Sequence, residues 1–204
     1  MRLTFRNSSG LDYVAEVADE LRDLGDLLLS LVAGKPAPAD GKSLKQRLDW
    51  NIVRLTRTGS EVVVEEPDYA YDSEHFLPGL NFTCAVLHAQ QLVHARLEVE
   101  AEPVNYDAGV LVYPEGLTAA GMAAIRQDSD LPEDSGWRVF DADRVDWKAE
   151  PHALRVYEIA AKRPELLSIL SLPAGWSIRM EGRSLAEAVS PEGKHMAADL
   201  NISL

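Results

Sequence analysis

The spacing of apolar residues divides this chain into helix-like and strand-like segments that follow one another in no regular order. Apolar residues recur at every third or fourth position between Leu11 and Leu31 and again between Leu80 and Leu97, which predicts two helices with one buried face each. Other segments alternate apolar and polar residues, as half-buried strands do. Because the regular strand–helix rhythm of a parallel sheet is missing, this order predicts an α+β fold, with mostly antiparallel sheets packed against amphipathic helices.

The first predicted helix has clear boundaries in the sequence. Ser8 and Ser9 are suitable N-cap residues, and Gly34, followed by two prolines, ends the periodic segment. We therefore expect one amphipathic helix that contains residues 11–31, with Gly25 as a candidate position for a kink.

A β-hairpin is predicted after this helix. Residues 50–57 alternate apolar and polar side chains, and residues 61–66 carry three consecutive valines. Thr58-Gly59 supplies the turn between the two segments. Residues 66–76 are expected to form a loop that leads to the second helix.

The second half of the chain contains shorter segments, and two of them stay ambiguous. Residues 117–126 fit either a strand or a helix, and the residues after Gly193 fit either a strand or a frayed terminus. Pro164 suits the first position of a second helix within a longer helical segment. The remaining predicted elements are strands at 109–113, 137–140 and 176–181 and helical structure at 155–172.

Pro103 follows an acidic segment and marks the expected domain boundary. We expect an N-terminal region at residues 1–103, with a helix, a hairpin and a second helix, and a C-terminal α+β region at residues 104–204.

The charge of the chain restricts the class of partner. It has 33 acidic and 20 basic side chains, a formal net charge of −13 and a pI near 4.8. Such a surface repels nucleic acid and anionic membranes, and it accelerates the encounter with basic proteins. The simpler alternative is that the acidity only keeps the protein soluble.

The sequence favours a cytoplasmic protein. Its one cysteine, Cys84, forms no internal disulfide, which suits a reducing compartment. The first ten residues lack the apolar core of a signal peptide, and the apolar stretch after Asp26 is too short to span a bilayer. The oligomeric state is left open.

The sequence has no motif that indicates a cofactor or a metal, and we predict neither. The chain has no glycine-rich phosphate loop, and its five histidines are scattered, without the paired spacing of zinc ligands. Asp128-Ser129-Asp130 and Asp141-Ala142-Asp143 resemble the beginning of a calcium loop, but the central Gly and the closing Glu are missing.

Cys84 is the one candidate nucleophile that has a histidine nearby. His88 follows it by one helical turn, a spacing that can lower the pKa of a thiol. Apolar neighbours on the same predicted helix favour a buried structural thiol instead. We therefore predict no catalytic residue and no enzymatic activity, with an enzyme or small-ligand module built on Cys84, His88 and nearby acids as the alternative.

Residues 132–140 form the most distinctive segment. Asp134 and Ser135 suit hydrogen bonds to nearby backbone amides, and Gly136 suits a positive φ or a close backbone approach. Trp137 then begins a strand and is expected to place its ring in the core. A turn followed by a core anchor explains these residues without any binding role.

The same segment also resembles a bacterial family, the immunity protein 33 type, over roughly residues 60–182. The residues that carry the resemblance are Asp134-Ser135-Gly136-Trp137-Arg138-x-Phe140, Tyr157-Glu158-Ile159, Pro164-Glu165-Leu166-Leu167 and Leu172-Pro173-x-Gly175, preceded by Val64-Glu65-Glu66-Pro67-Asp68-Tyr69 and the helix with Gln90-Gln91.

The resemblance implies a protein of bacterial toxin loci that neutralises a cognate toxin by binding it directly in the cytoplasm. An acidic inhibitor of this kind is expected to meet a basic surface through its loops. The alternatives are solvated turns with one buried Trp, and a scaffold or regulatory module with another partner. The predicted partner-binding residues are Asp128, Asp130, Glu133, Asp134, Asp141, Asp143 and Trp147.

Overall fold

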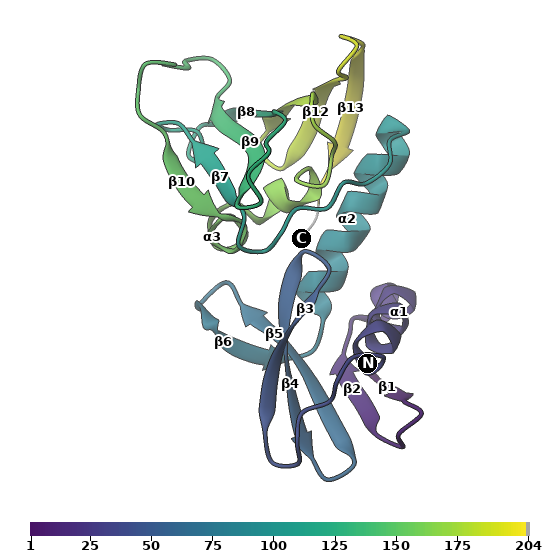
Figure 1. The fold of residues 1–204 in the computed structure, drawn as a ribbon. Coiled ribbons are helices and arrows are strands. Elements are labelled where there is room, and N and C mark those ends of the chain that lie inside the picture. The colour runs from purple at the N-terminus through teal and green to yellow at the C-terminus, as the bar shows by residue number, and fades with distance from the viewer. Residues whose placement is uncertain (203–204) are drawn as a thin grey trace. The chain divides into compact units, whose positions relative to one another are not determined.

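The computed structural model describes residues 1–202 and divides the chain into two compact units, Met1–His88 and Ala89–Leu204 (Figure 1). Each unit contains its own β-sheet, and the fold is α+β. The division falls within helix α2 (Asn81–Leu97). The domain boundary expected at residue 103 stays a prediction, because compactness alone does not define an independently folding domain.

The first unit is built on a six-stranded mixed sheet with the order β1-β2-β5-β4-β3, and β6 also pairs with β5. The β2–β5 pair is parallel, and the other described pairs in this sheet are antiparallel. The short helix η1 (Asp19–Leu21) and helix α1 (Arg22–Ala33) follow β2. The strands are β1 (Arg2–Arg6), β2 (Asp12–Glu16), β3 (Ser43–Leu48), β4 (Asn51–Thr58), β5 (Glu61–Asp68) and β6 (Asp72–Pro78).

Strand β5 has two different neighbours along one edge. Its first residues, Glu61–Val63, pair with β2, and its later residues, from Glu65 onward, pair with β6. Where β2 and β6 meet, Gly79 has a φ of 130°, and a Cβ there would lie 2.6 Å from the backbone oxygen of Glu16. This close approach requires a glycine.

The expectation of one helix over residues 11–31 is wrong in its first half. Residues Asp12–Glu16 form β2, and α1 begins only at Arg22. Tyr13, Val14 and Ala15 are all buried, so both faces of this strand are covered. A continuous apolar run of this kind also fits the spacing of a helix, and the sequence pattern alone therefore does not separate the two. Leu31, expected on the buried face of the helix, is 51% exposed.

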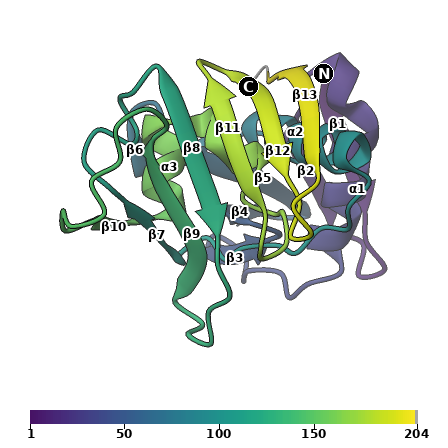
Figure 2. The same cartoon turned by 90° about the horizontal axis from the view of Figure 1, so that it is seen from above.

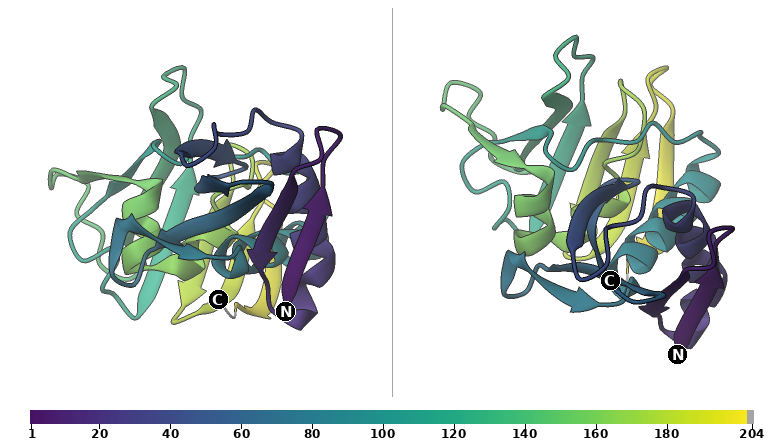
Figure 3. Two further views of the ribbon diagram at one scale, coloured as in Figure 1. Left: turned by 90° about the horizontal axis from the view of Figure 1, so that it is seen from below. Right: turned by 60° about the horizontal axis from the view of Figure 1, so that its bottom comes forward.

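Helix α1 covers β1 and β2 closely, as Figure 3 shows. A Cβ on Gly25 would lie 2.7 Å from Leu3 and 2.9 Å from Val17, so the absence of a side chain brings the helix onto the sheet. The buried residues of the helix are Gly25, Leu28, Leu29, Val32 and Ala33.

The predicted hairpin is confirmed by β4 and β5, which pair in antiparallel register around Gly59. The predicted loop at 66–76 is wrong at both ends, because β5 extends to Asp68 and β6 begins at Asp72. The polar segment Asp72–Pro78 has a weak apolar pattern. It forms a strand because it pairs with β5, the strand that precedes it in the chain.

Helix α2, expected over residues 80–97, begins on a buried carboxylate. The side chain of Glu66 accepts hydrogen bonds from the backbone amides of Phe82 and Thr83, each at 2.8 Å, and from the Thr83 hydroxyl at 2.7 Å. Burial raises the pKa of the Glu66 carboxyl, and the hydrogen bonds from Thr83 and Phe82 oppose that rise. An acceptor at this position satisfies amides that have no partner within the helix. Strand β5 therefore supplies the cap for α2.

The second unit contains a seven-stranded mixed sheet with the order β10-β7-β9-β8-β11-β12-β13 (Figure 2). The β7–β9 pair is parallel. The ambiguous segments are both strands, since residues 121–126 form β8 and residues 195–201 form β13. The elements are β7 (Gly109–Val112), β8 (Gly121–Arg126), β9 (Asp134–Asp141), β10 (His152–Arg155), α3 (Val156–Lys162), η2 (Pro164–Ser168), β11 (Ser177–Glu181), β12 (Ser184–Val189) and β13 (His195–Asn201).

The side chains of Trp137 and Arg126 form buried hydrogen bonds in the core of the second unit. The fully buried indole of Trp137 donates from Nε1 to the Leu170 carbonyl at 2.9 Å. The buried guanidinium of Arg126 donates to the carbonyl oxygens of Ser135, at 3.1 Å, and Leu172. The bonds to Leu170 and Leu172 connect the centre of the sheet to the segment that follows η2, and the bond to Ser135 joins β8 to β9. Within residues 1–202, no helix has both the length and the apolar character needed to cross a membrane.

Replacing Glu66 tests its role as the cap of α2. Glu66→Ala leaves two amides and a buried hydroxyl without their acceptor, so we expect a loss of about 2 kcal/mol in the free energy of unfolding. Urea unfolding followed by far-ultraviolet circular dichroism measures this loss. Glu20→Ala, at an exposed position in η1, is the control. Equal effects of the two variants would contradict the capping role.

Candidate functional site

The two faces of the second sheet differ in what covers them. Side chains that point toward α3 and η2 are buried, and Trp137, Val139 and Ile178 are among them. The opposite face, toward the viewer in Figure 2, carries the alternate residues of the same strands. We call this surface the open face; its residues include Ala123, Ile125, Phe140, Ser177, Arg179, Glu187 and Val189.

A shallow groove of about 170 Å³ lies on the open face. Strand register explains its depth, because Ala123 pairs with Phe140 on one side and with Arg179 on the other. A small side chain between two large ones leaves a hollow in the surface. Ile125 and Val189 continue the apolar lining, so the groove is apolar at its centre.

Charged side chains surround this apolar centre. Arg179 lies 3.7 Å from a carboxylate oxygen of Asp143 and 3.5 Å from one of Glu181. Both distances exceed those of strong ion pairs. On the other side of the groove, Glu187 pairs with Nδ1 of His195 at 2.5 Å.

An aromatic cluster borders the groove. Trp147, in the loop between β9 and β10, is 55% exposed. Its ring centroid lies 4.8 Å from that of Phe140 and 5.2 Å from that of Tyr113, both in edge-to-face geometry. A turn closed by Asp146, whose carboxylate accepts from the Lys148 amide at 2.9 Å, holds the loop around Trp147. The alternative of a buried Trp at this position is therefore wrong.

The predicted acidic residues do not gather at one point. Asp128, Asp130 and Glu133 are exposed in the loop between β8 and β9, whereas Asp141 is the last residue of β9 and Asp143 follows it. The length of β8 separates these two groups by roughly 20 Å. Asp143 and Trp147 adjoin the groove, and the loop acids flank the opposite end of the open face.

Asp134 has a structural role. Arg138 donates to both of its carboxylate oxygens, at 3.2 and 3.0 Å, and the Gly136 amide donates at 2.9 Å. These bonds, that from Arg138 first, outweigh burial and lower the pKa of the Asp134 carboxyl. A carboxylate that is already bonded on both oxygens is a weak candidate for partner contact.

The distinctive segment around Trp137 builds the fold. The Ser135 hydroxyl donates to the Gly109 carbonyl at 2.6 Å. Gly136 has a φ of 79°, and a Cβ there would lie 2.0 Å from the backbone oxygen of Gln127. The turn and core anchor expected from the sequence explain these residues fully.

Sequence reasoning missed most of the groove. Ala123, Ile125, Phe140 and Val189 carry no charge or motif that distinguishes them from core residues. The one available signal is β8 itself, where four apolar residues in a row occupy both faces of a strand. Such a run is expected when both faces are covered, yet among residues 1–202 no helix lies over the face of β8 that is turned toward the viewer in Figure 2.

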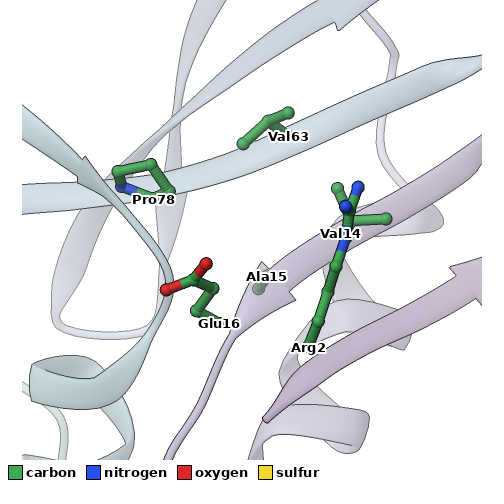
Figure 4. Close-up of a pocket in the computed structure, with 6 residues that line it drawn as sticks. All are labelled: Arg2, Val14, Ala15, Glu16, Val63 and Pro78. Carbon is green, nitrogen blue, oxygen red and sulfur yellow. The ribbon is translucent and has the colours of Figure 1, made fainter.

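The first unit offers a weaker candidate surface. On the sheet face away from α1, charges pair across strands, as Arg6 does with Asp12 at 2.7 Å and Arg54 with Glu65 at 2.6 Å. Figure 4 shows a second pocket at the fork of β2, β5 and β6, where Arg2 is already paired with Glu61 at 2.7 Å. The pocket is lined by Arg2, Val14, Ala15, Glu16, Val63 and Pro78.

The candidate nucleophile is unsuited to catalysis. Cys84 is fully buried, and burial, followed by the charge of Glu66, raises the pKa of its thiol to about 12. His88 is exposed. Among residues 1–202, no three His, Cys, Asp or Glu side chains converge in a way that could hold a metal ion.

The fold and the open face define an α+β protein that presents one uncovered, partly apolar sheet surface. The family model of the Imm33-like domain matches residues 89–190, half of the chain, so the chain belongs to the Imm33-like family. The match confirms the resemblance to the immunity protein 33 type. It begins at residue 89, so the resemblance over residues 60–88 stays a prediction. No curated protein and no solved structure matches the chain significantly.

The Asp134–Arg138 pair predicts a pH-dependent contribution to stability. Because the pKa of Asp134 is lowered in the folded state, the contribution is present above the ordinary pKa of an aspartate, about 3.9. It is lost as the pH falls through the folded value. Asp134→Asn should cost about 1 kcal/mol at neutral pH and much less in strong acid.

Urea unfolding at neutral and acid pH measures both values. Glu133→Gln, at the exposed neighbouring position, is the control and should change neither. A destabilisation by Asp134→Asn that is independent of pH would show that the charge of Asp134 does not contribute.

Proposed function

We propose that this protein is an immunity protein that neutralises a cognate bacterial toxin by binding it, without catalysis. The observation that carries the proposal is membership of the Imm33-like family over residues 89–190. The open face and its exposed Trp147 lie within that range and supply a surface suited to protein contact.

The charge of the chain supports a basic partner. With a net charge of −13, the protein attracts a positively charged surface over long range and accelerates encounter. A toxin that acts on nucleic acid has such a surface, because it must bind phosphates. We therefore propose a basic toxin that the protein meets in the cytoplasm of the producing cell.

The runner-up functions have less support. A small-ligand module needs a deep site, and the groove of about 170 Å³ is smaller than the roughly 300–1,000 Å³ of typical ligand pockets. An enzyme built on Cys84 would need an accessible thiolate, which burial disfavours. A regulatory module with a protein partner other than a toxin would use the same open face.

Co-expression with the polypeptide encoded by the adjacent gene tests the function. If that polypeptide is the toxin, we expect cells that produce it to survive only when this protein is present. Calorimetry with the two purified proteins should show a stoichiometric complex that weakens as salt is added, since charge attraction is screened. Absence of both protection and binding would refute the proposal. Tight binding that salt does not affect would support the toxin partner and refute electrostatic steering.

The acidic loop between β8 and β9 can be tested separately. The double variant Asp128→Asn with Asp130→Asn should slow association several-fold and reduce its salt dependence. Glu20→Gln with Asp23→Asn, both exposed in the first unit, changes the net charge equally and is the matched control. Stopped-flow association rates measure both. Equal slowing would show that total charge acts rather than this loop.

A further inference from the structure

We propose that the groove on the open face is a socket that takes one apolar side chain of the toxin, with basic toxin residues around it meeting the surrounding carboxylates. This inference rests on the proposed function and identifies the interface and the chemistry of the partner that fits it.

The shape of the groove carries the first step. Ala123 lies between Phe140 and Arg179, and Ser177 lies between Ile125 and Val189. Small residues are therefore enclosed by larger ones in neighbouring strands, which produces a hollow fixed by backbone pairing. Such a hollow needs no rearrangement before it receives a side chain, and pre-formed sites bind at lower entropic cost.

The size of the groove fits one side chain. Its volume of about 170 Å³ is well below that of a cofactor or drug-sized site. Apolar lining by Ile125, Phe140 and Val189 favours an aliphatic or aromatic occupant. Single buried anchors of this kind dominate the binding energy of many protein interfaces.

Trp147 supplies a second contact beside the socket. Its ring is held by Phe140 and Tyr113, yet more than half of its surface is accessible. A large aromatic group that is already ordered loses little entropy on binding, and Trp is enriched at energetic centres of interfaces.

The surrounding charges select the partner. Asp143 and Glu181 share Arg179 at distances of 3.5 Å and more, so a closer cation can compete for them. Glu187 is 44% exposed and borders the same groove. A second copy of this acidic chain would bring like charges together, whereas a basic toxin surface would complement them.

Filling the socket tests the inference. Ala123→Trp places a large side chain in the groove and leaves the core face of β8 unchanged. In the complex with the adjacent-gene polypeptide, we expect the dissociation constant to rise at least about 100-fold, and Trp147→Ala to raise it about 30-fold. Thr4→Trp, exposed on β1, and Tyr71→Ala, an 81% exposed aromatic in the first unit, are the matched controls and should bind normally.

A milder variant covers the case in which Ala123→Trp fails to fold. Ala123→Cys introduces an accessible thiol, while the native Cys84 is buried and unreactive. Its alkylation by iodoacetamide should slow at least tenfold when the toxin is bound, and alkylation of Thr4→Cys should not slow.

The outcomes separate the two proposals. Normal binding and protection by Ala123→Trp, or unchanged alkylation of Ala123→Cys in the complex, would overturn the socket and leave the immunity function standing. No binding by the unsubstituted protein would overturn both. Self-association of the unsubstituted protein that Ala123→Trp abolishes would assign the groove to a second copy and overturn the inference.

Discussion

The buried indole of Trp137 is the contact on which the second unit depends. Its ring lies at the centre of the sheet, and its Nε1 donates to the Leu170 carbonyl on the covering layer. Gly136 makes this placement possible, because only a residue without Cβ permits the approach of Gln127. Arg126 adds further bonds on the same side of the sheet. The bonds to the carbonyl oxygens of Leu170 and Leu172 hold the covering segment on this one face of the sheet.

The faces of the two sheets that no helix covers, among the described residues, carry different kinds of side chain. In the first unit, cross-strand pairs such as Arg54–Glu65 match the charges of neighbouring strands and satisfy them locally. Burial opposes ionisation of Glu65, but its bonds to Arg54 and Thr56 outweigh burial and lower the pKa of the carboxyl. In the second unit, apolar positions such as Ile125 occupy the corresponding face. These apolar side chains are buried or half-buried, and beside them the ring of Trp147 is exposed, a combination that suits contact with another protein.

Local sequence signals were sufficient for some elements and insufficient for the site. The β4–β5 hairpin and α2 were predictable because a turn or a single helical face specifies each of them. Strand β2 was wrongly predicted as the first part of a helix. Pairing with β1 and β5 buries Tyr13 and its neighbours, and the spacing of apolar residues does not reveal this pairing. The acids and Trp147 were chosen by residue type alone. The distance between the two groups of acids and the groove at Ala123 both depend on how the strands pair. Strand register could not be predicted from the sequence.

Under the proposed immunity function, this geometry divides recognition of the toxin into two physical steps. The exposed acids at Asp128 and Asp130 act over long range, where charge guides approach but contributes little to a final bound state in water. The groove and Trp147 act only at contact, where apolar burial and shape decide how long a complex lasts. The acids follow β8, Trp147 follows β9 beyond the other end of the sheet, and the groove lies between them, so one sheet fixes the spacing among all three. A partner that matches both must carry its positive charge and its apolar anchor at the same separation, and that requirement gives an acidic inhibitor specificity beyond charge alone.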